Sequence, residues 1–308
     1  MLEIKKIAIL GTGLMAHAIV QEFAQNGYEV HMIGRSDASN NRALKNIETN
    51  LTNLKDKGLI NEEDIKAASN NIYTHLRIEE MPNDVDLVIE SVLEDLDLKR
   101  DLFKKIESLC SEKTILASNT SSFPPSQIAK DLKNPERFLN THYFNPAYLV
   151  PLVELVKTEK TEDKYIEIVF DLYTKIGKNP VILKKEFPGF VANRLQIAML
   201  REALHIVQSG VATAQDVDTV IKSSIGRRWA VAGVFEVCEL AGLDLFSKIA
   251  KELLPTMDSS TEVSPLAIEK VKAGELGAKT GKGFYEWTPE SIVALKKKIA
   301  DHLIAMNS

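Results

Sequence analysis

The stretch KIAILGTGLMA, residues 6–16, decides the fold of this chain. Its first five residues form a short apolar run, which is typical of a strand buried on both faces. After the glycine-containing turn, apolar residues recur at helical spacing: Met15, Ile19, Val20 and Phe23. Gly27 predicts the end of this helix, and EVHMI at 29–33 predicts a second strand. This is a βαβ unit, which predicts a parallel sheet covered by helices.

The turn between the first strand and the helix has the spacing of a dinucleotide-binding loop. Gly11 permits the tight turn, Gly13 lets the backbone approach a pyrophosphate, and Ala16 is small enough for the helix to pack closely on the strand. The N-terminal amides and the positive dipole end of the helix face the phosphates. We therefore predict dinucleotide binding. The alternative is a glycine-rich turn that has no ligand.

The second strand runs into Gly34, Arg35 and Ser36, where a NAD-selective domain carries an Asp or Glu that bonds the adenosine ribose. Gly34 removes the repulsion that such a carboxylate exerts on a 2′-phosphate. Arg35 adds a planar cation suited to phosphate, and Ser36 adds a hydroxyl. The turn therefore favours NADP acceptance within an NAD(P) cofactor class. The alternatives for Arg35 are a plain surface residue and a residue that stacks on adenine.

Composition excludes several classes of protein. The chain has 308 residues, 44% hydrophobic and 26% charged, with a formal net charge of −5, so two globular domains are expected and a nucleic-acid partner is not. Cys110 and Cys238 lie far apart, which argues against a disulfide framework or a metal site and favours a reducing compartment. No apolar run approaches membrane-spanning length. The start KKIAILG leaves no room for a signal peptide, and we expect a cytoplasmic protein.

Residues 37–69 predict a polar pair of helices, interrupted at Gly58, that is larger than a normal crossover and projects from the sheet. Beyond Pro188 the pattern is helical. The predicted fold is α/β: a doubly wound Rossmann-type sheet with a helical projection over 1–186, then an all-helical domain over 187–308. Further strands are expected at 71–74, 86–90, 114–118, 138–142, 152–156 and 181–183.

Five further motifs occur in order along the chain: VIESVLEDLDLK (88–99), SNTSS (118–122), HYFNP (142–146), PGFVANR (188–194) and TGKGFYEW (280–287). With the first loop they make nearly the whole chain resemble the L-3-hydroxyacyl-CoA dehydrogenase family, which includes 3-hydroxybutyryl-CoA dehydrogenases. The resemblance implies an enzyme of fatty acid metabolism that interconverts a (3S)-3-hydroxyacyl-CoA and a 3-ketoacyl-CoA with NAD(P). It also implies a homodimer formed through the helical domain.

The chemistry of alcohol oxidation assigns roles to two residues. His142 follows a strand-like segment, at the carboxyl end where open α/β sheets bind ligands. A histidine titrates near neutral pH, so it can take the hydroxyl proton as hydride leaves and return it in the reverse direction. A carboxylate at Glu154 would fix the imidazole tautomer and stabilise imidazolium. The resemblance makes these two the catalytic pair. The alternative is a buried pair with a purely structural role.

Other roles come from the resemblance alone. Ser121 and Asn193 match the positions that contact the substrate oxygen, although a turn hydroxyl and a helix cap are the ordinary alternatives. Glu94 and Lys99, with Asn119 of SNTSS, match positions near the cofactor; in isolation, Glu94 and Lys99 would form a solvated helical patch. Lys57 matches a lysine that reaches the CoA moiety, and its alternative is an ordinary surface lysine.

Gly34 is one departure from the family pattern, and it concerns the cofactor. Two further departures leave the identity of the substrate undecided. VAGVFEV (231–237) stands where the family commonly has Gly-Pro. SSIGRRWAVAG (223–233) resembles the branch of lambda-crystallin and L-gulonate dehydrogenases, which act on hydroxy acids without CoA. Arg227 and Arg228 could bind a carboxylate there, or pair with surface acids. A dehydrogenase of a free hydroxy acid is therefore the second hypothesis. A catalytically silent binding or structural protein is the third, and the intact set of catalytic residues Ser121, His142, Glu154 and Asn193 argues against it.

Overall fold

The computed structural model describes residues 3–307. The chain divides into two compact units. Unit 1 comprises the chain up to Phe190 together with the chain from Ile299 onward, and unit 2 comprises residues 191–298. The division falls four residues beyond the predicted boundary at 186/187 (190 − 186 = 4), and the end of the chain belongs to unit 1 instead of the helical domain.

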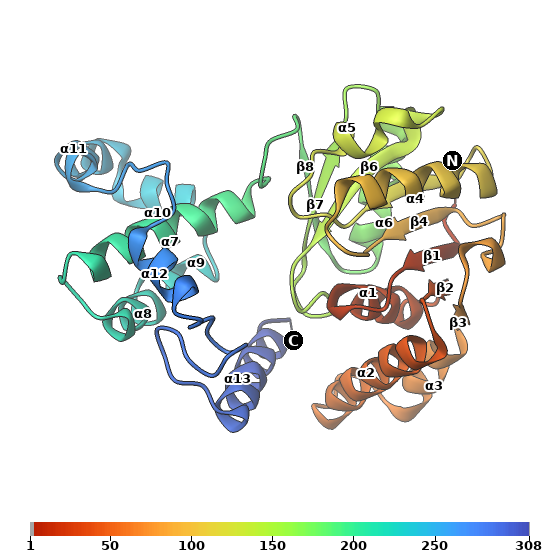
Figure 1. Cartoon of the computed structure of the whole chain (residues 1–308), viewed down its shortest axis with the longest axis horizontal. Coiled ribbons are helices and arrows are strands. Elements are labelled where there is room, and N and C mark those ends of the chain that lie inside the picture. The colour runs from red at the N-terminus through yellow and green to blue at the C-terminus, as the bar shows by residue number, and fades with distance from the viewer. Residues whose placement is uncertain (1–2, 308) are drawn as a thin grey trace. The chain divides into compact units, whose positions relative to one another are not determined.

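Unit 1 is built on one eight-stranded sheet of order β3-β2-β1-β4-β5-β6-β7-β8 (Figure 1). β1 to β6 run parallel, β7 runs antiparallel to β6, and β8 runs parallel to β7. Strand order reverses between β1 and β4, which is the switch point where open α/β sheets bind ligands. Every predicted strand is present: β1 (Lys6–Leu10), β2 (Glu29–Ile33), β3 (Ile72–His75), β4 (Leu87–Glu90), β5 (Ile115–Ser118), β6 (Phe138–Tyr143), β7 (Leu152–Lys157) and β8 (Asn179–Leu183).

Helices cover both faces of this sheet, and β1 shows why. Its alternate side chains point to opposite faces, so Ile7 and Ile9 join a core with α1, whereas Ala8 and Leu10 join a second core with α4. All four side chains are buried, as expected for a strand covered on both sides. The helices of unit 1 are α1 (Leu14–Gln25), α2 (Asp37–Asp56), α3 (Glu62–Asn70), α4 (Leu96–Leu109), α5 (Pro125–Ile128) and α6 (Asp163–Lys175), with short 3-10 turns at Ile78–Glu80, Ala129–Asp131 and Pro135–Arg137.

The predicted helical pair is α2 and α3, which lie side by side (Figure 1). Gly58, at φ 73°, makes the break between them. The pair is anchored, because Ala43, Ile47 and Leu51 of α2 belong to the same buried core as α1.

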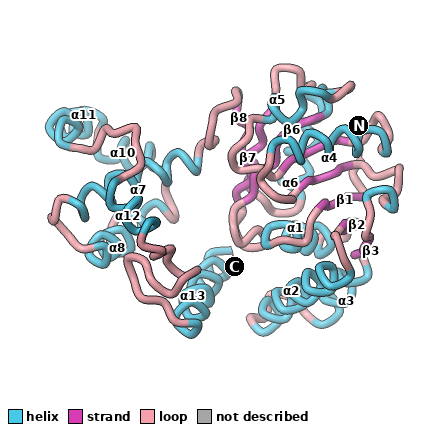
Figure 2. Tube along the Cα trace, viewed as in Figure 1, coloured by secondary structure: helices cyan, strands magenta, loops and turns pink. Residues whose placement is uncertain are grey.

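Unit 2 contains helices and loops without a strand among residues 191–298, apart from isolated bridges at residue 282 (Figure 2). Its elements are α7 (Ala192–Gln208), α8 (Ala214–Ser223), α9 (Ile225–Trp229), α10 (Val234–Ala241), α11 (Leu243–Leu253), a 3-10 turn (Leu254–Thr256), α12 (Pro265–Lys272) and the start of α13 (Pro289–Asn307). No residue from 191 to 298 is buried in the chain. In residues 3–307, none of the helices is both long and apolar enough to cross a membrane.

The end of α13 belongs to unit 1 for a packing reason. Ile304 is buried against Leu54 of α2 and Leu149. The Asn307 amide Nδ2 donates to the Leu149 carbonyl at 2.7 Å, and Asp301 pairs with Lys57 at 2.8 Å. The prediction that the helical domain extends to residue 308 missed these long-range contacts.

Candidate active site

The turn after β1 is shaped by close backbone packing. Gly11 has φ 120°, and its N–H donates to the Ile33 carbonyl at 2.9 Å. A Cβ at this position would lie 2.4 Å from the Ser91 carbonyl oxygen, far inside van der Waals contact for atoms that are not bonded to one another. Gly11 is therefore required by the protein itself, in agreement with its predicted role in the tight turn.

Gly13 stands in a different environment. A Cβ there would meet no protein atom within 4 Å, so the space beside it is open to a ligand. α1 begins at the next residue, with no side-chain cap and no acidic residue in its first turn. Ala16 is fully buried behind the turn. Open space beside the first amides of a helix fits a pyrophosphate, so the residues present fit a dinucleotide cofactor.

The turn after β2 lies beside the first one in the sheet. The Gly34 N–H donates to the His75 carbonyl at 3.0 Å. Ser36 is the N-cap of α2, where its Oγ accepts from the Ser39 N–H at 3.2 Å. Arg35 is exposed, and in residues 3–307 its guanidinium has no hydrogen bond or ion pair. A cation held without a partner at the carboxyl end of β2 remains available to a phosphate.

His142 and Glu154 face one another across the antiparallel β6–β7 strand pair. They are direct partners in the β6–β7 register, and His142 Nδ1 lies 2.8 Å from Glu154 Oε2. Both side chains are buried. A carboxylate accepts hydrogen bonds, so Nδ1 of the neutral ring carries the proton and Nε2 has the free lone pair. Such a ring can accept a proton at Nε2, while the carboxylate stabilises the imidazolium that forms.

Aromatic rings line the imidazole. The ring centroid of Phe144 is 4.5 Å from that of His142, and the ring centroid of Phe190 is 5.3 Å away. Phe190 is fully buried and has φ 51°. These contacts restrict the orientations of the ring and keep water from it, which strengthens the interaction with Glu154.

The SNTSS loop that carries Ser121 is attached to the same strand as His142. Asn119 Oδ1 accepts from the Tyr143 N–H at 3.0 Å, and the Phe123 carbonyl accepts from Asn140 Nδ2 at 2.9 Å. Because β6 residues 140 and 143 flank His142, the loop is held at the end of the strand that presents the imidazole. Ser121 itself is exposed. The structure thus places Asn119 as a support of this loop.

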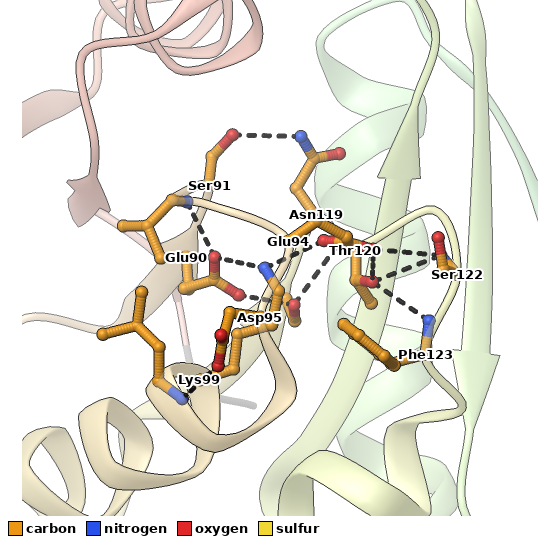
Figure 3. A network of polar contacts seen from close by, with 12 residues as sticks. Glu90, Ser91, Glu94, Asp95, Lys99, Asn119, Thr120, Ser122 and Phe123 are labelled. Atoms are coloured by element: carbon orange, nitrogen blue, oxygen red, sulfur yellow. Dashed lines mark hydrogen bonds and ion pairs between the residues drawn. The ribbon is translucent and has the colours of Figure 1, made fainter. Parts of the chain in front are cut away.

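Glu94 and Lys99 belong to a polar network under this loop (Figure 3). Lys99 is 1% exposed; its Nζ lies 2.7 Å from Glu90 Oε1 and 3.2 Å from Glu94 Oε2. Glu90 is fully buried and also accepts from Ser118 Oγ at 2.6 Å. The alternative of a solvated helical patch is therefore wrong for Lys99. Sequence reasoning missed Glu90, although a carboxylate that ends the apolar run DLVIE was a usable signal.

Glu94 connects that ion pair to the loop. Its Oε1 accepts from the Thr120 hydroxyl and, at 3.2 Å, from the Ser122 N–H. Burial raises the pKa of Glu94, but the Thr120 hydrogen bond and the Lys99 charge outweigh burial, so the net effect lowers the pKa. An ionised Glu94 therefore fixes the residues on either side of Ser121.

The remaining predicted residues lie elsewhere. Lys57 is the C-cap of α2 and is paired with Asp301 of α13. Asn193 is the second residue of α7 in unit 2, where Val191 takes the N-cap position, so the helix-cap alternative is wrong. Arg227 and Arg228 are exposed on α9.

These features define a class: an oxidoreductase with a Rossmann-type NAD-binding domain followed by a helical domain. Two family models match this chain. The model for the NAD binding domain of 3-hydroxyacyl-CoA dehydrogenase matches residues 6–187. The model for the C-terminal domain of 3-hydroxyacyl-CoA dehydrogenase matches residues 189–287. The chain belongs to the 3-hydroxyacyl-CoA dehydrogenase family, and the resemblance found in the sequence is confirmed.

Relatives within the family differ in their substrates. The chain is 36% identical over 287 residues to a 3-hydroxybutyryl-CoA dehydrogenase of Clostridioides difficile, covering 92% of this chain and 99% of the relative. It is 33% identical over 303 residues to 5-formyl-3-hydroxy-2-methylpyridine 4-carboxylate 5-dehydrogenase of Mesorhizobium japonicum, covering 98% and 97%.

Similar solved structures include one enzyme named for a pyridine carboxylate and one named for 3-hydroxybutyryl-CoA. The crystal structure of a 5-formyl-3-hydroxy-2-methylpyridine 4-carboxylic acid 5-dehydrogenase, described as an NAD+ dependent dismutase, gives a TM-score of 0.92 at 33% identity, covering 98% of this chain and 97% of that one. (S)-3-hydroxybutyryl-CoA dehydrogenase from Ralstonia eutropha gives 0.78 at 30% identity, covering 93% and 100%.

Proposed function

We propose that this protein interconverts a secondary alcohol and a ketone, with His142 as the general acid and base. The observation that carries the proposal is the 2.8 Å contact between His142 Nδ1 and Glu154 Oε2 in direct strand register. His142 Nε2 takes the hydroxyl proton in oxidation and returns it in reduction. The nicotinamide cofactor, when bound, takes or supplies the hydride. Ser121 and Asn193 are proposed to hold the substrate oxygen, as the family resemblance implies.

We propose a short-chain (3S)-3-hydroxyacyl-CoA and its 3-ketoacyl-CoA as the substrate pair. The family, and relatives named for 3-hydroxybutyryl-CoA, support this choice. The long α2–α3 pair supplies a surface for the CoA arm, and Lys57 stands at the end of α2.

A free hydroxy acid is the second candidate, because a residue of α13 pairs with Lys57, the lysine that the resemblance assigns to the CoA moiety. Asp301 of α13 neutralises Lys57 at 2.8 Å. The family model ends at residue 287, before α13 begins at Pro289. The relative named for a pyridine carboxylate spans 98% of this chain, against 92% for the C. difficile enzyme.

Initial rates separate the two candidates. We expect acetoacetyl-CoA to be reduced with a higher kcat/KM than free acetoacetate, and L-gulonate to be oxidised poorly. Lys57→Ala should raise the KM for acetoacetyl-CoA with little change in kcat, because it removes binding that is equal in the ground and transition states. Lys55→Ala is the matched control, since Lys55 is a half-buried lysine of the same helix and pairs with Glu62.

A higher kcat/KM for a free hydroxy acid would remove the CoA assignment and support the second candidate. Turnover of neither kind of substrate by folded protein would contradict the enzymatic proposal itself.

For the cofactor, we propose that NADP is accepted at least as well as NAD, on the strength of the unpaired Arg35. Arg35→Ala should lower kcat/KM for NADPH by roughly 10- to 150-fold, which corresponds to the loss of one charge-assisted hydrogen bond of about 1.5–3 kcal/mol. The value for NADH should change little. Lys45→Ala, an exposed cation further along α2, is the control. An unchanged NADPH to NADH ratio in Arg35→Ala would contradict this proposal.

We also propose that the protein is a homodimer joined through unit 2. Large apolar side chains of this unit are exposed, including Leu195 at 60%, Phe235 at 80% and Leu240 at 87%. Side chains of residues 191–298 are partly buried at most, so little apolar burial offsets the entropy of ordering these helices, and a second copy would supply further contacts, in agreement with the family resemblance. Light scattering at micromolar concentration should give twice the chain mass of 34.3 kDa. A mass of one chain would exclude the dimer.

A further inference from the structure

The absence of a side chain at position 34 has a local cause. A Cβ on Gly34 would lie 1.9 Å from Asn40 Oδ1 and 2.8 Å from Thr12 Cγ2. Gly34 is not among the residues with positive φ, so its backbone conformation does not demand glycine. The methyl group of Thr12 is the end of a side chain that can rotate away. The Asn40 amide is therefore the neighbour that restricts position 34.

Asn40 is held tightly in that position. It lies in the first part of α2, is 3% exposed, and donates from Nδ2 to the His75 carbonyl at 3.1 Å. The same carbonyl accepts from the Gly34 N–H at 3.0 Å. Turning the Asn40 side chain away would leave its buried amide nitrogen and this carbonyl with fewer partners, which is costly in the protein interior.

The oxygen of the Asn40 amide points at the place where a side chain of residue 34 would begin. This Oδ1 is buried and has no hydrogen-bond partner in residues 3–307. Its partial negative charge is therefore not compensated by a donor. A carboxylate side chain at position 34 would clash with the Asn40 amide. Its negative charge would also be repelled by the partial negative charge of Oδ1.

We propose that Asn40 is a residue that determines cofactor specificity, because it excludes an acid from position 34. The inference rests on the proposed function, in which the β2 turn receives the adenosine ribose. An acid at the end of β2 binds the ribose 2′-hydroxyl and repels a 2′-phosphate. With Asn40 in place neither effect is available, and recognition of the 2′-position is left to Arg35. Placing an acid at position 34 while Asn40 is kept therefore cannot make the protein select NAD over NADP.

A double-mutant cycle tests the proposal: wild type, Gly34→Asp, Asn40→Ala and the double variant. Thermal unfolding without ligand measures the steric conflict. Calorimetric Kd values for ADP-ribose and 2′-phospho-ADP-ribose measure specificity without turnover. We expect Gly34→Asp alone to lower Tm and weaken both ligands. The double variant should regain the Tm of Asn40→Ala and shift the ratio of Kd values at least tenfold toward ADP-ribose.

Gly34→Ala with Asn40→Ala is the matched control, and it should regain Tm without shifting the ratio, because it adds no charge. If the first double variant does not fold, Gly34→Asp with Asn40→Gly gives the same test with more room. A folded Gly34→Asp variant that shifts the ratio as far as the double variant would overturn the proposal, as would a double variant with the wild-type ratio. Binding of neither ligand by the wild type would overturn the dinucleotide function as well.

Discussion

Replacing His142 with Gln should abolish measurable turnover while cofactor binding persists. Gln cannot accept a proton near neutral pH, so the reaction loses its general base in one direction and its general acid in the other. Such groups contribute about 10²- to 10⁴-fold to rate. The turns at Gly11 and Gly34 are separate from the imidazole in the chain and keep their backbone contacts. The measurements are kcat under saturating substrate and the cofactor Kd from fluorescence.

Glu154→Gln is the companion variant. It keeps the shape of the side chain but removes the charge that stabilises imidazolium, so kcat should fall strongly, with the substrate KM much less affected. Near-normal kcat in a folded His142→Gln protein would refute the assignment of this pair. Equal effects on kcat and on cofactor Kd would point instead to a structural role.

Replacing Lys99 with Met should destabilise the protein by about 3–5 kcal/mol, because it leaves a buried carboxylate without its counter-charge. Glu90 is fully buried and Lys99 is 1% exposed. Val92 N–H and Ser118 Oγ would still donate to Glu90, but neither carries a charge. Urea unfolding measures the loss as a lower midpoint with an unchanged slope.

Two controls make this result specific to the buried pair. Lys104→Met, on the same helix, removes a lysine whose ion pairs are exposed, and it should cost about 0–1 kcal/mol. Adding Glu90→Gln to Lys99→Met should recover much of the loss, since no unpaired charge remains. A Lys99→Met protein with the stability of the Lys104→Met protein would show that the pair does not hold unit 1 together.

The sheet and the phosphate turn could be predicted because their signals are local. Ile7 and Ile9 alternate with Ala8 and Leu10 in one apolar run, and Gly11 has a spacing that follows from backbone geometry. The pairing of His142 with Glu154 needed the family resemblance, since sequence does not state which strands are neighbours. The structure supplied the antiparallel register that brings the two together.

Long-range contacts were beyond the sequence. Taken in isolation, Lys99 would be a solvated helix position, and the family resemblance places it near the cofactor; only the structure shows its buried ion pair with Glu90. Lys57 and Asp301 are 244 residues apart in the chain (301 − 57 = 244), so neither segment indicates the ion pair that assigns the end of α13 to unit 1. Asn40 was overlooked because its effect is to leave no room at Gly34.

The alignment of the proposed catalytic dyad comes from the antiparallel β6–β7 pair and not from the length of the loop that joins its two members. His142 and Glu154 are aligned by hydrogen bonds between strands, so their pairing does not depend on how many residues connect the strands, provided that Phe144 stays against the imidazole and Leu149 stays in its cluster with Ile304. A slip of β7 by one residue is different, because it turns Glu154 to the other face of the sheet. In protein engineering, residues inserted into this connection could carry new substrate contacts, whereas an insertion or deletion within β7 before Glu154 would separate imidazole from carboxylate.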